Sequence, residues 1–97
     1  MPTVSRDVTV INERGLHARP AMQFVDVANE FVSEVTVHKD AVAQGDEALD
    51  VDGKSVMQMI TLEGTPGTVL RITATGEDAE AAVAKLVGLF ESKFGEE

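Results

Sequence analysis

Pro20 is the residue that most constrains how this chain can fold, because it fixes where a helix begins. The residues before it, 4–11 (VSRDVTVI), are rich in β-branched side chains and partly alternate, which predicts a strand. Residues 12–15 predict a turn. Apolar residues then recur at the spacing of one helical face: Ala21, Phe24, Val25, Ala28 and Phe31. Since proline is tolerated in the first turn of a helix and disrupts its interior, this helix must begin at about residues 17–19.

The remaining hydrophobic pattern predicts three more strands and two more helices. We expect strands at 32–39, 47–51 and 69–76, a short helix within 52–62, and a longer helix over 77–94. The resulting order is β-α-β-β-α-β-α. Four strands and three helices in 97 residues predict an α+β fold, in which a four-stranded antiparallel sheet carries three helices on a single face. Residues 1–97 suffice for one domain with a single modest core.

The same patterns predict which side chains are buried. We expect the core to include Val35, Val37, Leu70, Ile72 and Ala74 on the strands, and Ala79, Val83, Leu86, Phe90 and Phe94 on the last helix. The short helix has two apolar sides, so it is either buried all round or partly exposed. We favour Met59 and Leu62 in the core, which leaves an exposed patch on the other side: Val56, Met57 and Ile60.

Composition excludes several classes of function. The chain has no cysteine, which excludes disulfides, thiolate metal sites and cysteine nucleophiles. Eight basic and seventeen acidic residues give a formal charge of −9, so we expect no binding to nucleic acid or anionic membranes. This charge fits either plain solubility or a preference for basic partners. The sequence shows no signal peptide and no membrane-spanning stretch, so we expect a cytoplasmic protein without membrane insertion.

His17 is the candidate functional residue, in the stretch GLHARPA. A helix start presents unpaired N–H groups and the positive end of the helix dipole, and therefore attracts phosphate. An imidazole there can receive a phosphoryl group on a ring nitrogen, while the first-turn amides, such as that of Ala18, bind the added charge. Arg19 can add a charge-assisted contact to the phosphate oxygens, and Gly15 allows a close approach of the preceding chain. Such an open site suits a carrier.

Other interpretations of His17 stay open on the residues alone. A histidine near a helix start can be no more than an exposed or capping residue. A catalytic acid or base is disfavoured, because no carboxylate stands at a recognisable spacing from His17 and nothing indicates a pocket. The Gly-x-His-x-Arg-Pro cluster at the expected cap position favours the phosphoryl carrier.

Three segments, GLHARPA, KSVMQMITL and GTVLRITATGEDAEAAVAKL, together resemble HPr, the histidine-containing phosphocarrier family of the phosphoenolpyruvate-dependent phosphotransferase system. The resemblance implies an open-faced β-sandwich and a carrier that is not itself an enzyme. It also implies that enzyme I phosphorylates the pros ring nitrogen of His17, that Arg19 supports the phosphate, and that EIIA-type domains accept the group. We expect a monomer with no cofactor and no metal. A regulatory relative, acting through phosphorylation-dependent protein binding, is the alternative.

The resemblance extends to Ser55 and the short helix. Ser55 stands where the N-cap of that helix is expected, and this alone explains a serine there. It also matches the regulatory serine that an ATP-dependent kinase, HPr kinase/phosphorylase, modifies in some bacteria. In the family this helix and the first helix form the docking face for partners, so we expect Met22 to join the patch. Methionine suits a surface that must fit several proteins.

The chain also departs from the family. Asp26 and Asn29 stand where many relatives have lysines, the connection 40–47 is longer, and Glu63 replaces a common glycine. His38 is expected to be a surface histidine, because no charged cluster stands around it at the spacing of metal ligands. The neighbouring acidic residues do not have the spacing of a calcium loop, and we expect a solvated acidic edge: Asp40, Asp46, Glu47, Asp50 and Asp52.

Overall fold

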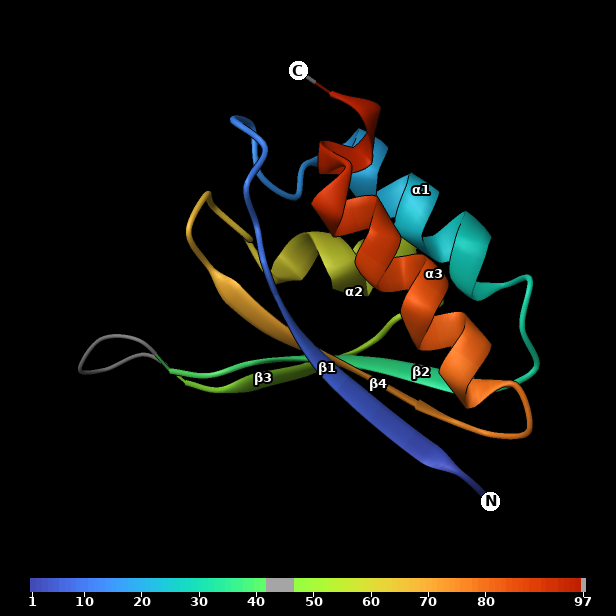
Figure 1. The fold of residues 1–97 in the computed structure, drawn as a ribbon. Coiled ribbons are helices and arrows are strands. Elements are labelled where there is room, and N and C mark those ends of the chain that lie inside the picture. The colour runs from blue at the N-terminus through green and yellow to red at the C-terminus, as the bar shows by residue number, and fades with distance from the viewer. Residues whose placement is uncertain (42–46, 97) are drawn as a thin grey trace.

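The computed structural model describes residues 1–41 and 47–96 and contains the expected elements in the expected order (Figure 1). The strands are β1 (Thr3–Thr9), β2 (Glu34–Lys39), β3 (Leu49–Asp52) and β4 (Val69–Thr75). The helices are α1 (Ala18–Ala28), α2 (Val56–Thr61) and α3 (Ala79–Glu91), and a short 3-10 turn, η1 (Lys93–Gly95), follows α3. The order β-α-β-β-α-β-α and the α+β class are confirmed.

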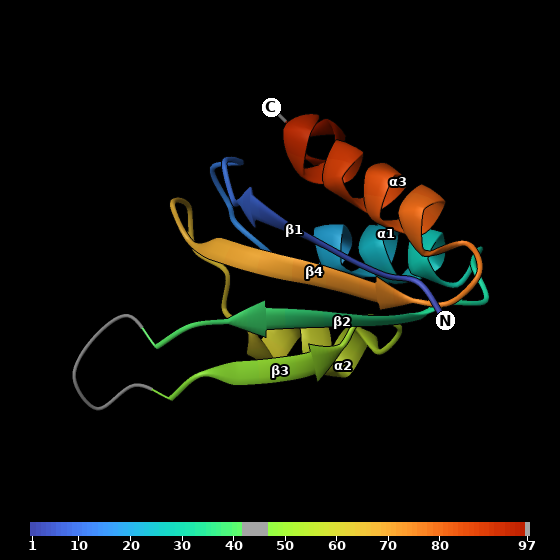
Figure 2. The same cartoon turned by 60° about the horizontal axis from the view of Figure 1, so that its bottom comes forward.

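The four strands form one antiparallel sheet in the order β1-β4-β2-β3. The three helices lie on one face of the sheet and leave the other face open (Figure 2). Register places buried side chains opposite one another: Val37 pairs with Ile72 on one side and with Val51 on the other. The core therefore lies between the sheet and the helices, as an open-faced sandwich requires.

All of the strand and last-helix residues predicted for the core are buried. The aromatic rings pack edge to face, with centroids 6.1 Å apart for Phe24–Phe90 and 4.8 Å apart for Phe90–Phe94. Phe31 is only half-buried, because α1 ends at Ala28 and Phe31 lies beyond the helix. Among the described residues, no helix is long and apolar enough to cross a membrane.

The end of the last helix differs from the prediction. We expected one helix over 77–94, but α3 ends at Glu91, and Lys93 and Phe94 have left-handed φ angles of 57° and 55°. Each costs about 1 kcal/mol for a non-glycine residue. Burial of the Phe94 ring, worth about 2–3 kcal/mol, offsets this strain. The turn is also tied to α1, because Gln23 Nε2 donates to the Phe94 carbonyl at 3.2 Å. It directs the end of the chain back toward the start of α1 (Figure 1).

Candidate functional site

His17 is the N-cap residue of α1, where the sequence predicted the helix to begin. Its backbone is extended (φ −81°, ψ −169°), and its carbonyl accepts the amide of Ala21 at 3.1 Å. The imidazole does not cap the helix, and 33% of the side chain is exposed. Within the described part of the chain, no acceptor is bound to the amides of Ala18 and Arg19. The ring and two helix-start amides are therefore available to a ligand.

A tight turn positions His17. Gly15 has φ +65°, and a Cβ there would lie 2.2 Å from the Gly64 carbonyl oxygen. The Leu16 amide donates to that same oxygen at 2.8 Å. The side-chain amide of Asn12, which is 2% exposed, donates to the Gly15 carbonyl at 2.7 Å. The close approach expected at Gly15 is confirmed, and it joins this turn to the loop that follows α2.

The structure brings a carboxylate to His17 that the sequence did not indicate. Glu96 Oε2 lies 2.6 Å from His17 Nε2, and Asn12 Nδ2 donates to Glu96 Oε1 at 2.9 Å. The Glu96 side chain is 15% exposed. Our expectation that His17 lacks a partner carboxylate is wrong, because the turn at Lys93–Phe94 returns the chain end to α1.

Hydrogen bonds to Glu96 favour its ionised form. Partial desolvation acts to raise the pKa of Glu96, but the hydrogen bonds from Asn12 and His17 and the nearby positive charge of Arg19 act against it. The net pKa of Glu96 lies below its ordinary value. Glu96 therefore acts at neutral pH as a pure hydrogen-bond acceptor.

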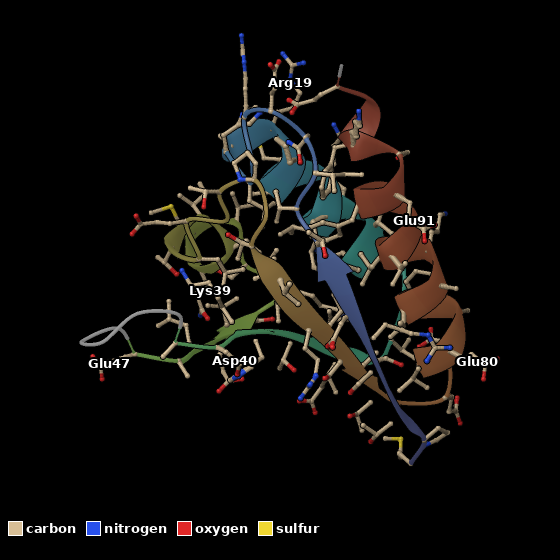
Figure 3. All side chains as sticks on the ribbon, turned by 60° about the vertical axis from the view of Figure 1, so that its left-hand side comes forward. Arg19, Lys39, Asp40, Glu47, Glu80 and Glu91 are labelled. Atoms are coloured by element: carbon tan, nitrogen blue, oxygen red, sulfur yellow. The ribbon has the colours of Figure 1, made fainter. Side chains whose placement is uncertain are left out.

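Two arginines border the site. Glu13, Arg14, Arg19, Gly95 and Glu96 line an open polar depression of about 400 Å³. Figure 3 shows Arg19 at the end of the molecule where the chain terminates. Arg19 is exposed and, among the described residues, forms no ion pair. Arg14, which sequence reasoning missed, lies in the turn before His17 and adds a second guanidinium that can bind an anion.

Comparisons with known proteins bear on this geometry. A family model described as the PTS HPr component phosphorylation site matches residues 4–92. The chain belongs to the HPr family. Phosphocarrier protein HPr of Haemophilus influenzae is 46% identical over 85 residues, which cover 88% of this chain and 92% of that protein. Phosphocarrier protein NPr of Escherichia coli is 33% identical over 95 residues, covering 98% and 99%. The crystal structure of HPr-C-His from Thermoanaerobacter tengcongensis is 41% identical, with a TM-score of 0.83 and coverage of 100% and 99%.

The HPr resemblance seen in the sequence is thus confirmed, and so is the HPr fold. The chain is an HPr-type phosphocarrier protein of the phosphotransferase system. Its helix α2 begins as predicted, because Ser55 is the N-cap and its hydroxyl accepts the amide of Gln58 at 3.3 Å. Ser55 is half-buried. Glu63, directly after α2, has a left-handed φ of 48°.

The apolar patch of this HPr-family chain lies on the neighbouring helices α1 and α2. Met57 is 77% exposed, Met22 54% and Ile60 39%, while Met59 and Leu62 are fully buried as predicted. Val56, which we placed in the patch, is half-buried against the core and exposes only part of its side chain. We call Met22, Met57 and Ile60, with the exposed part of Val56, the docking patch.

The second histidine of this HPr-family chain has two carboxylate partners. His38 Nε2 lies 2.6 Å from Asp40 and Nδ1 lies 2.8 Å from Asp50. Their hydrogen bonds, Asp40 first, raise the pKa of His38 against a smaller effect of desolvation. The two carboxylate partners of His38 were not expected from the sequence, but the described residues hold no cluster at metal-ligand spacing around it. Asp46 lies outside the described residues, and within them no three acidic or histidine side chains are arranged to hold a metal ion.

Proposed function

We propose that His17 carries the phosphoryl group of this HPr-family protein, accepting it from phospho-enzyme I and passing it to EIIA-type domains. The observation that carries the proposal is a partly exposed imidazole at a helix start, beside two unoccupied amides and Arg19. Phosphoryl transfer requires mainly positioning and stabilisation of charge on the phosphate oxygens. The amides of Ala18 and Arg19 and the guanidinium of Arg19 supply this stabilisation.

The protein acts as a carrier rather than as an enzyme. The polar depression beside His17 is open, so it does not shield a reacting group from water as phosphotransfer enzymes do. A donor or acceptor protein must complete the site by covering it. We propose that residues 1–97 act as one HPr domain and as a cytoplasmic monomer, because His17 and the groups that support its phosphate lie in the same chain.

The docking patch supplies the apolar part of that contact. Met22, Met57 and Ile60 expose large apolar surface beside the helix that begins at His17. Asp26, where many relatives have lysine, is exposed on the same helix. Partners of this protein therefore rely on apolar contact, or present basic groups near Asp26.

Regulation at Ser55 is the second candidate function. Its hydroxyl is half-exposed at the N-cap of α2, next to Val56 and Met57 of the docking patch. A phosphate added there by HPr kinase/phosphorylase is tolerated by a helix start and places charge beside the patch. Separately from Ser55, a regulatory HPr-type protein would use the phosphorylated His17 site to bind other proteins instead of feeding sugar uptake.

The labelling experiment uses enzyme I of the same organism with phosphoenolpyruvate. The intact mass should rise by one acid-labile phosphoryl group in the natural chain. His17→Ala should abolish this gain, and His38→Ala, the matched control at the other histidine, should retain it. Labelling of the His17→Ala protein, or no labelling of the natural chain, would contradict the proposal.

A further inference from the structure

We propose that Glu96 is a positioning residue that holds the His17 ring in the tautomer whose Nδ1 is the nucleophile. The inference rests on the proposed function of His17 and concerns how its reactive nitrogen is selected. Three contacts support it: Glu96 to Nε2, Asn12 to Glu96, and Asn12 to the Gly15 carbonyl.

The orientation of the Asn12 amide follows from its partners. A backbone carbonyl can only accept hydrogen bonds, so the group facing the Gly15 oxygen at 2.7 Å must be the Asn12 NH₂. The same nitrogen lies 2.9 Å from Glu96 Oε1, and its second hydrogen points there. Asn12 is 2% exposed, so this arrangement is held inside the protein. Asn12 therefore fixes one Glu96 oxygen and leaves the other to His17.

The tautomer of His17 follows from the charge of Glu96. An ionised carboxylate has no hydrogen to donate, so at 2.6 Å the hydrogen must belong to His17 Nε2. In a neutral ring the other nitrogen, Nδ1, then carries the lone pair. Nδ1 has no hydrogen-bond partner among the described residues. Glu96 thus leaves Nδ1 as the nitrogen able to attack phosphorus.

Phosphoryl transfer to Nδ1 requires no proton to move. The Nδ1 lone pair forms the N–P bond, while the bond from phosphorus to the donor protein breaks and its electron pair stays with the donor. Nε2 keeps its hydrogen, so the phosphorylated ring is cationic and faces the Glu96 carboxylate. That carboxylate stabilises the ring cation, as the aspartate of a catalytic triad does for its histidine. On transfer to an acceptor, the same steps run in reverse.

The fixed Asn12 amide makes Glu96→Gln an informative variant. The glutamine carbonyl oxygen must face the Asn12 NH₂, which turns the glutamine NH₂ toward His17 Nε2. Nε2 must then accept a hydrogen bond, and the hydrogen moves to Nδ1, which loses its nucleophilic lone pair. Glu96→Ala removes the carboxylate without imposing this wrong tautomer. A tautomer role therefore predicts that Glu96→Gln is slower in transfer than Glu96→Ala.

The tautomer is measured first, without any phosphoryl donor. ¹⁵N-labelled full-length protein in mildly alkaline buffer should show His17 protonated on Nε2, and Glu96→Gln should shift this proton to Nδ1. His38 serves as an internal reference whose signals stay unchanged. The exposed glutamate at the end of α3 gives a matched control, Glu91→Gln, which should leave the His17 signals as they are. A natural protein with His17 protonated on Nδ1 would overturn the inference.

Phosphoryl transfer from phospho-enzyme I is measured next. We expect a loss of about threefold in Glu96→Ala and about tenfold or more in Glu96→Gln, with Glu91→Gln at the natural rate. Transfer at or above the natural rate in Glu96→Gln would overturn the inference, since Glu96 would then be neutral or obstructive. Equal losses in both variants without a tautomer change would also overturn it. If the natural protein accepts no phosphate at all, the proposed function fails, while the tautomer measurement still decides the role of Glu96.

Discussion

The two histidines of this chain are both paired with carboxylates, and they differ in how many ring nitrogens are occupied. His38 has Asp50 on Nδ1 and Asp40 on Nε2, whereas His17 has Glu96 on Nε2 alone. Figure 3 shows Arg19 at the top of the molecule, near the chain end, and Asp40 well below it. A ring with both nitrogens bound has no lone pair to offer. Of the two rings, only that of His17 has a nitrogen open to receive the phosphoryl group of the proposed function.

The surroundings of the two rings differ in the same sense. His17 stands at the start of an 11-residue helix with unoccupied amides, and its partner Glu96 lines a depression together with Arg14 and Arg19. His38 lies within strand β2, with two exposed carboxylates as its partners. Negative groups around His38 repel a phosphate, while the helix start and the arginines attract one. Occupancy and charge therefore distinguish the two sites together.

Gly15→Ala should have the largest effect on stability and transfer, because it displaces the turn that holds His17 at the helix start. His38, on a strand, has no such turn. The new Cβ would lie 2.2 Å from a backbone oxygen, in a residue with φ +65°. We expect the free energy of unfolding to fall by about 3 kcal/mol, and phosphoryl transfer to slow in the protein that still folds. Denaturant unfolding measures the first effect. Gly67→Ala is the control, since φ is +93° but nothing lies within 4 Å; a loss as large as that of Gly15→Ala would show that the close contact is unimportant.

Arg19→Ala should have the next largest effect and act on transfer alone. The exposed guanidinium makes no ion pair among the described residues, so its loss should change the free energy of unfolding by less than about 0.5 kcal/mol. Without it we expect phosphoryl transfer to slow by about tenfold, the size of one charge-assisted hydrogen bond. Rapid-quench transfer rates provide the measurement. Arg71→Ala removes an arginine on another face, paired with Asp7 at 3.0 Å, and should transfer at the natural rate. Equal rates in both variants would remove Arg19 from the site.

The smallest expected effect is a pH dependence at His38. Its pKa is raised in the folded protein above the ordinary 6.5, so its contribution to stability is fully present below about pH 6.5 and is lost as pH rises through the folded pKa. The partners are exposed, which limits the effect to less than about 1 kcal/mol. Glu96 has the opposite sign: its pKa is lowered, so its contribution is lost as pH falls. The free energy of unfolding of His38→Gln, measured by denaturation from below pH 6.5 upward, should not show the loss of stability that His38 causes in the natural protein. An unchanged pH dependence would contradict the pairing of His38 with Asp40 and Asp50.

Local patterns predicted most of the fold and part of the site. Pro20 and the apolar spacing after it gave the start of α1, and alternation gave the buried faces of β2 and β4. His17, Arg19 and the N-cap Ser55 were predicted for the same reason: the residues that define each position lie within one turn of it.

The missed features all depend on contacts between distant residues. Glu96 reaches His17 across 79 positions, and only the fold shows that they meet. The turn that brings it there was hidden because Lys93 and Phe94 adopt left-handed angles that usually belong to glycine. Asp50 reaches His38 from the neighbouring strand β3, which requires the register of the sheet. The spacing of residues within one helix or strand cannot predict contacts between residues so far apart in the sequence.

The most direct test of the account is to locate the phosphoryl group in the natural protein by ³¹P and ¹⁵N NMR after labelling with phosphoenolpyruvate and enzyme I. We predict one phosphoryl group, bonded to Nδ1 of His17, with the hydrogen still on Nε2 and His38 unmodified. A phosphoryl group on His38, or on Nε2 of His17, would contradict it.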